Sequence, residues 1–149
     1  MGNLNETQRQ LSYCGIYCGD CPMYTREISR TSEKLENLTA QAGFNQMAEY
    51  LPDMAWYTEF KEKLAWFREN VVCDGCRSDG RQYHEGCTLR DCCSARGIDF
   101  CPNCDNYPCN TVEEFKAQSP YFADNMKRIR EVGVDAYIEE QKKAGLPEC

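Results

Sequence analysis

Pairs of potential metal ligands, each separated by two residues, recur along the second half of the sequence. The pairs are Cys73 with Cys76, His84 with Cys87, and Cys101 with Cys104. Two intervening residues let one tight turn direct both side chains at the same ion, and Gly75 can adopt the left-handed backbone that such a turn uses. Thiolates together with an imidazole are typical ligands of a tetrahedral zinc ion. The spacing therefore predicts zinc binding, with iron–sulfur ligation as the alternative.

His84 is the only histidine of the chain. A lone histidine is usually an ordinary surface residue, but its place inside the series of cysteines favours a role as a ligand. We therefore expect its imidazole to share an ion with Cys73, Cys76 and Cys87.

The division of the ligands between sites is less determined than the ligands themselves. By sequence order, a second set of four ligands consists of Cys92, Cys101, Cys104 and Cys109. A crossed arrangement, in which Cys73 and Cys76 join Cys101 and Cys104, fits the spacing equally well. Both arrangements are kept as predictions.

A third group of cysteines, Cys14, Cys18 and Cys21, lies near the N-terminus. Its C-x3-C-x2-C spacing is also that of the radical S-adenosylmethionine enzymes, which hold a four-iron cluster with three thiolates. Those enzymes fold as a βα barrel or a large part of one, and the residues after Cys21 show no alternation of strands and helices. We expect these cysteines to complete a structural site with a fourth ligand from residues 92–109.

Counting the ligands leaves room for a catalytic or redox metal. The candidates number eleven: Cys14, Cys18, Cys21, Cys73, Cys76, His84, Cys87, Cys92, Cys101, Cys104 and Cys109. Two closed tetrahedral sites use eight ligands. The other three either borrow a ligand such as Cys93 or leave a coordination position open, as a catalytic metal requires.

The rest of the composition explains why metal is needed. The chain of 149 residues contains twelve cysteines but only eight Leu, five Ile and five Val, which is little aliphatic material for a core. Small domains with a thin core usually gain stability from disulfides or from metals. The first ten residues lack the basic and apolar regions of a secretory signal, so we expect a cytoplasmic protein, in which spaced cysteines more often bind metal.

Charge and hydropathy exclude two classes of partner. The formal net charge is −7, with 24 acidic and 17 basic side chains, and bound thiolates make it more negative. A chain of this charge lacks the counterion release that drives binding to nucleic acid. No apolar run approaches the length of a membrane span.

Helical spacing dominates outside the cysteine-rich segments. Tyr57, Phe60, Leu64 and Phe67 follow a period of three to four residues, and we expect Trp56 and Trp66 to pack in the same core. Further along the chain, Thr111 and Glu114 form a capping box, Ser119 with Pro120 starts another helix, and Gly133 stops it.

The expected fold is a single domain, residues 1–149, that is mainly α. Residues 12–21 and 71–110 are metal-binding cysteine segments, 22–70 a helical insert and 111–146 C-terminal helices. Asp-Gly steps and scattered Asn and Pro make the 71–110 segment rich in turns, so strands there should be short, although a small α+β fold is an alternative.

Four blocks of the sequence resemble a known family. They read Cys-Gly-Ile-Tyr-Cys-Gly-Asp-Cys-Pro-Met-Tyr, Cys-Asp-Gly-Cys-Arg-Ser-Asp-Gly, Cys-Thr-Leu-Arg-Asp-Cys and Cys-Pro-Asn-Cys-Asp-Asn-Tyr-Pro-Cys. The chain resembles, from residue 12 to about residue 115, the uncharacterised prokaryotic family called domain of unknown function 3795. Members of that family typically have a cysteine where this chain has His84. The resemblance implies metal binding and carries no known reaction.

Together these features predict a zinc-binding protein with about two ions and a metal-stabilised fold. Its helices offer surfaces to a protein partner, so an interaction or regulatory module is the leading function. The alternative is a metalloenzyme or an iron–sulfur redox protein that uses Cys14, Cys18 and Cys21. Storage or sensing of soft metals, which an excess of thiolates also favours, is a third class.

Overall fold

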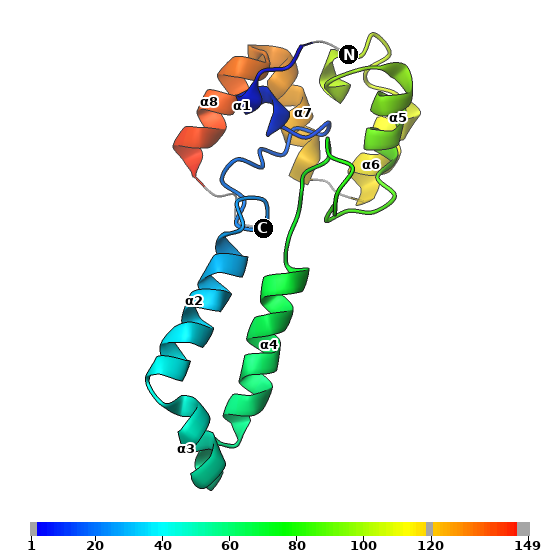
Figure 1. The fold of residues 1–149 in the computed structure, drawn as a ribbon. Coiled ribbons are helices and arrows are strands. Elements are labelled where there is room, and N and C mark those ends of the chain that lie inside the picture. Colours follow the sequence, from blue (N-terminus) through cyan, green and yellow to red (C-terminus); the bar gives the residue numbers. More distant parts are fainter. Residues whose placement is uncertain (1–2, 119–120, 146–149) are drawn as a thin grey trace. The chain divides into compact units, whose positions relative to one another are not determined.

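The computed structural model describes residues 3–118 and 121–145, and in these ranges the chain is mainly helical. Within these ranges it forms eight α-helices and two 3₁₀ helices, whose arrangement can be followed in Figure 1. Within the same ranges the only β pairing is an isolated bridge between Leu11 and Tyr17. The prediction of a mainly α fold without long strands is confirmed.

The chain divides into two compact units, which we name by their content. The hairpin unit is Pro22–Cys73, and the cysteine unit consists of Met1–Cys21 together with Asp74–Cys149. The helical insert expected at 22–70 corresponds to the hairpin unit. In the described parts of both units, no helix is long and apolar enough to cross a membrane.

The hairpin unit is built from two long helices, α2 and α4, that lie side by side (Figure 1). Its elements are α2 (Glu27–Gln41), α3 (Phe44–Tyr50), the 3₁₀ helix η1 (Pro52–Met54) and α4 (Trp56–Asn70). Gly43 separates α2 from α3 with a φ of 82°, a left-handed conformation that glycine adopts without steric cost. The structure describes every residue of this unit, and only Ser32, Tyr57 and Leu64 are buried.

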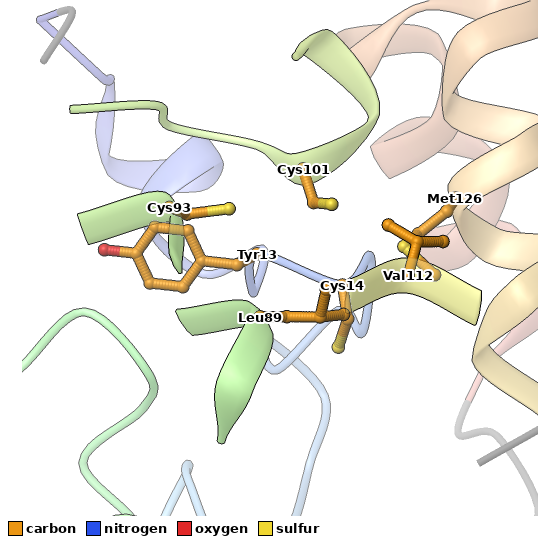
Figure 2. Close-up of a cluster of buried hydrophobic side chains, with 7 residues drawn as sticks. All are labelled: Tyr13, Cys14, Leu89, Cys93, Cys101, Val112 and Met126. Carbon is orange, nitrogen blue, oxygen red and sulfur yellow. The ribbon is translucent and has the colours of Figure 1, made fainter. Parts of the chain in front are cut away.

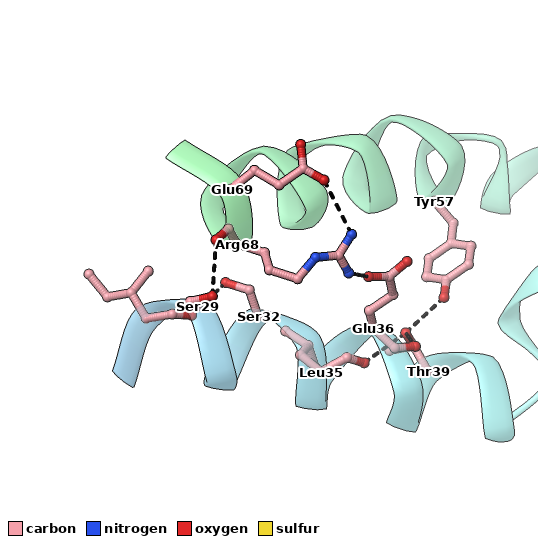
Figure 3. Close-up of polar contacts among 9 residues, drawn as sticks. Ser29, Ser32, Leu35, Glu36, Thr39, Tyr57, Arg68 and Glu69 are labelled. Atoms are coloured by element: carbon pink, nitrogen blue, oxygen red, sulfur yellow. Dashed lines mark hydrogen bonds and ion pairs between the residues drawn. The ribbon is translucent and has the colours of Figure 1, made fainter. Parts of the chain in front are cut away.

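Polar contacts supplement this small core (Figure 3). The hydroxyl of Tyr57 donates a hydrogen bond to Thr39 Oγ1 at 2.7 Å. A guanidinium nitrogen of Arg68 lies 2.7 Å from a carboxylate oxygen of Glu36, and Ser29 Oγ donates to the carbonyl oxygen of Arg68. These contacts fix α4 against α2 at both ends of their shared length.

The predicted packing of the two tryptophans is wrong. Trp56 is 52% exposed and Trp66 is 55% exposed, whereas Tyr57 is 1% exposed. In α4 the side chains that face α2 recur at Tyr57, Leu64 and Arg68, and both tryptophans fall on other sides of the helix. A hairpin of two helices covers only one face of each helix.

The cysteine unit contains the other helices and both large groups of buried side chains. Its elements are α1 (Glu6–Arg9), α5 (Thr88–Arg96), η2 (Cys101–Asn103), α6 (Asn110–Gln118), α7 (Tyr121–Val132) and α8 (Val134–Ala144). One group consists of aliphatic and aromatic side chains: Leu11, Tyr17, Phe100, Ile129, Tyr137 and Ile138. The other group contains cysteines and is described with the candidate site.

Of the three predicted helix boundaries, one differs from the structure, one lies outside the described residues and one is confirmed. Helix α6 begins at Asn110, so Thr111 lies inside the helix and not at its cap. The predicted start at Ser119 and Pro120 lies outside the described residues. Gly133, with a φ of 84°, follows the last residue of α7 as predicted.

Substitutions at Tyr57 and Trp56 test which side chain forms the core of the hairpin unit. Replacing Tyr57 by alanine should lower the free energy of unfolding by about 3–5 kcal/mol, because a buried aromatic ring and its hydrogen bond to Thr39 are lost. Replacing its half-exposed neighbour Trp56 should cost less than about 1.5 kcal/mol. Urea unfolding followed by helical circular dichroism measures both values. Equal losses in the two variants would contradict the assignment of Tyr57 as the centre of the hairpin.

Candidate metal centre

The centre of the cysteine unit is a buried group of side chains that includes thiols, which we call the cysteine core (Figure 2). Its fully buried members are Tyr13, Cys14, Leu89, Cys93, Cys101, Val112 and Met126. Cys76, Cys87 and Cys109 are partly buried and pack against it. Six cysteines from four separate segments of the chain thus meet in one core.

Cys93 and Cys101 are the most closely coupled of these cysteines. They are 2% and 6% exposed, and the thiol of Cys93 donates a hydrogen bond to the sulfur of Cys101. That bond raises the pKa of Cys93 and lowers the pKa of Cys101, and burial raises the pKa of Cys93 further. Negative charge on Cys92 or Cys104 also raises the pKa of Cys93, so these four sulfurs are electrostatic neighbours.

Cys14 forms a second thiol site within the same core. Its sulfur lies 3.2 Å from Ser12 Oγ, which also accepts a hydrogen bond from the backbone N–H of Ile16. Burial raises the pKa of the Cys14 thiol, the Ser12 hydroxyl opposes that rise, and the charge of Cys87 adds to it. Burial therefore keeps this thiol neutral until a cation stabilises the thiolate.

The backbone around Cys14 is held on both sides. The backbone N–H of Cys101 donates to the carbonyl oxygen of Tyr13 at 3.1 Å, and the hydroxyl of Tyr137 donates to the carbonyl oxygen of Gly15 at 2.9 Å. Gly15 has a φ of 90°, and a Cβ atom there would lie 2.8 Å from Ile129. The turn that carries Cys14 is thus locked between the 101 segment and helices α7 and α8.

Cys18 and Cys21 lie outside the cysteine core and share a turn. The backbone N–H of Cys21 donates to the carbonyl oxygen of Cys18 at 3.0 Å, and that of Cys18 donates to Gln10 at 2.7 Å. Both side chains are partly buried. Cys14 is therefore the member of the N-terminal group that belongs to the core.

The other predicted ligands occupy more open positions. His84 is exposed, and its ring meets the ring of Tyr83 edge-on with the centroids 4.8 Å apart. Cys92 and Cys104 are partly buried. Cys73 is the last residue of the hairpin unit, where its backbone N–H donates to the carbonyl oxygen of Met23.

Among the residues that the structure describes, no three His, Cys, Asp or Glu side chains converge as the ligands of one ion. The donor set nevertheless has the right chemistry for zinc, since thiolates are typical ligands of a tetrahedral zinc ion and several thiols lie in or against one core.

Cys93 is the buried cysteine of the core that the spacing of the cysteines did not identify as a metal ligand. Sequence order favoured its neighbour Cys92, because Cys92 fits the regular series of ligands. In helix α5, however, Leu89 and Cys93 are four residues apart and both are buried, so they share the face that packs on the core. Helical periodicity from Leu89 would have pointed to Cys93.

The tight packing at Gly15 yields a matched pair of variants. Gly15 and Gly86 both have a positive φ, but a Cβ atom at Gly86 would meet no atom within 4 Å. Both alanine variants should lose about 1 kcal/mol from backbone strain, and Gly15→Ala should lose about 1–3 kcal/mol more because the methyl group collides with Ile129. Thermal unfolding of the two variants measures the difference. Equal stability would show that the turn at Cys14 is looser than the structure indicates.

Comparison with known proteins identifies the matched region but no activity. The model of a family described as protein of unknown function (DUF3795) matches residues 10–114. That range contains every cysteine from Cys14 to Cys109. No curated protein and no solved structure matches the chain.

Proposed function

We propose that this chain, which belongs to the family of proteins of unknown function DUF3795, is a cytoplasmic zinc-binding protein that acts as an interaction or regulatory module. About two zinc ions held by thiolates would stabilise the cysteine unit, and the helices would present surfaces to a protein partner. Zinc supplies no redox chemistry; its contribution when bound is to link distant segments of the chain.

The observation that carries this proposal is the burial of several thiols side by side. A single buried cysteine behaves as a small apolar residue and needs no metal. Cys14, Cys93 and Cys101 are all buried in the same core, with Cys76, Cys87 and Cys109 against it. Six thiols in one core, from segments whose spacing already matches zinc ligands, favour coordination over simple packing.

We propose that the ligands divide into two groups. One centres on Cys93 and Cys101, which are buried in the same core and joined by a hydrogen bond, with Cys92 and Cys104 as electrostatic neighbours of Cys93. The other centres on Cys14, which is buried in the same core with Cys87 packed against that core. This division keeps the second group of the sequence-order arrangement nearly intact and adds Cys93 to it.

Other partners fit less well. The formal net charge of −7 opposes binding to nucleic acid, and bound thiolates make the charge more negative. An iron–sulfur protein that uses Cys14, Cys18 and Cys21 is the competing proposal, and its visible absorbance separates it from colourless zinc protein.

Metal analysis tests the proposal directly. Protein purified under reducing conditions without added metal should contain about two zinc ions per chain and should be colourless. Removal of the zinc with a chelator should weaken the near-ultraviolet circular dichroism and lower the melting temperature, because the aliphatic core is thin. Protein that contains no metal yet keeps its near-ultraviolet signal and melting temperature would refute the proposal, and a brown protein with iron would support the competing one.

His84 provides a second test of the ligand assignment. If its imidazole binds zinc, His84→Cys should retain the metal, because a thiolate fits the same tetrahedral position. His84→Ala should lose zinc to a competing chelator at a concentration lower by at least about tenfold, because one of four ligands is gone. Zinc retention in the wild type and the two variants decides the matter. Retention that is the same in all three proteins would make His84 an ordinary surface residue, in line with its exposure.

A further inference from the structure

Arg77 directly follows the candidate ligand Cys76 and extends into the cysteine unit. Its Nε donates a hydrogen bond to the carbonyl oxygen of Leu11 at 2.9 Å, and its Nη2 donates to the carbonyl oxygen of Asp99. The guanidinium also lies over two aromatic rings, 4.3 Å from the centroid of Tyr13 and 4.7 Å from that of Phe100.

These contacts fall beside the candidate ligands. Tyr13 precedes Cys14, and Phe100 precedes Cys101, while Arg77 itself follows Cys76. One side chain therefore joins three segments that each carry a buried or partly buried thiol of the cysteine core.

The position is unusual for a cation and needs compensation. Taking a guanidinium out of water is unfavourable unless hydrogen bonds and opposite charges replace the lost hydration. Two carbonyl oxygens and two ring faces supply part of that compensation. The remaining neighbours that stabilise the positive charge include Asp99 and the sulfurs of Cys76 and Cys93.

We propose that Arg77 is a positioning residue for the metal centre: its guanidinium clamps the segments of Cys14, Cys76 and Cys101 together and balances the negative charge of the metal-bound thiolates. The proposal rests on zinc binding as the proposed function. A zinc ion with four thiolates carries a net charge of about −2, and burying that charge is favourable only beside a cation or hydrogen-bond donors.

The geometry selects arginine over lysine. A planar guanidinium stacks between two rings while its nitrogens donate in two directions, whereas an ammonium is a compact point charge that cannot do both. Lysine at this position should keep the charge but lose the clamp. The two parts of the proposal are therefore separable by substitution.

The experiment compares Arg77→Met and Arg77→Lys with the wild type and with Arg96→Met. Arg96 is an exposed cation in the last turn of α5 and controls for the loss of one positive charge from the unit. Each protein is loaded with zinc under reducing conditions, and zinc transfer to a competing chelator is measured. The melting temperature of each metal-free protein is measured separately.

We expect Arg77→Met to lower the apparent zinc affinity by about tenfold to a hundredfold, as loss of a group that supports metal ligands does. Arg77→Lys should recover part of that affinity because the charge remains, while its metal-free melting temperature stays as low as that of Arg77→Met. Arg96→Met should match the wild type in both measurements. If Arg77→Met does not fold, Arg77→Lys decides, and it must hold zinc less tightly than the wild type but more tightly than Cys101→Ser.

Four results overturn the proposal. Wild-type affinity in Arg77→Met shows that the metal centre does not depend on Arg77, and an equal loss in the Met and Lys variants shows that the charge plays no part. If Arg96→Met loses as much zinc affinity as Arg77→Met, the effect reflects the net charge of the cysteine unit and not the position of Arg77. A wild type that holds no zinc refutes the proposed function, and the metal role of Arg77 with it, and is recognised before any variant is compared.

Discussion

The burial of thiol groups at the centre of the cysteine unit is the constraint on which the rest of that unit depends. With so few aliphatic side chains, the chain places Cys14, Cys93 and Cys101 where a larger domain would place leucine or isoleucine. A thiol fills such a place as a small apolar group only while it is protonated. The same side chain becomes a strong ligand when a cation stabilises its thiolate. The core is therefore compatible with packing alone and also with the metal binding that we propose.

In the hairpin unit, polar contacts between helices compensate for the small core. It buries only three of its own side chains, all within the fully described range Pro22–Cys73, and adds hydrogen bonds and an ion pair between α2 and α4. Several of its large apolar side chains are exposed, Trp56 at 52% and Trp66 at 55% among them. A pair of helices has no second layer to cover these faces, which is why periodicity alone placed them wrongly in a core.

Local rules of sequence predicted the helical architecture well, but they did not reveal which cysteines share the buried core. The spacing of Tyr57 and Leu64 identified α4 because helical periodicity is a local property, and Gly133 marked the end of α7 for the same reason. The grouping of Cys14 with Cys93 and Cys101 is a long-range property, since it depends on how three distant segments fold together. Spacing names residues that can bind metal, but it does not reveal which of two adjacent cysteines faces the core.

If the thiols of the cysteine core bind metal as proposed, their negative charge makes a nearby cation important. Each thiolate in the core adds negative charge to a chain that already carries a net charge of −7, and a low dielectric strengthens their mutual repulsion. The raised pKa of Cys14, which burial and Cys87 produce, is one expression of this repulsion. In the proposed site zinc would remove part of this repulsion, and the Arg77 guanidinium, which lies over the rings of Tyr13 and Phe100, would offset more of it. The guanidinium is held by two backbone carbonyl oxygens, which do not titrate, and by the faces of two aromatic rings. In the proposed metal centre, a fixed guanidinium at Arg77 would hold the segments of Cys14, Cys76 and Cys101 near one another and offset part of the negative charge of the bound thiolates.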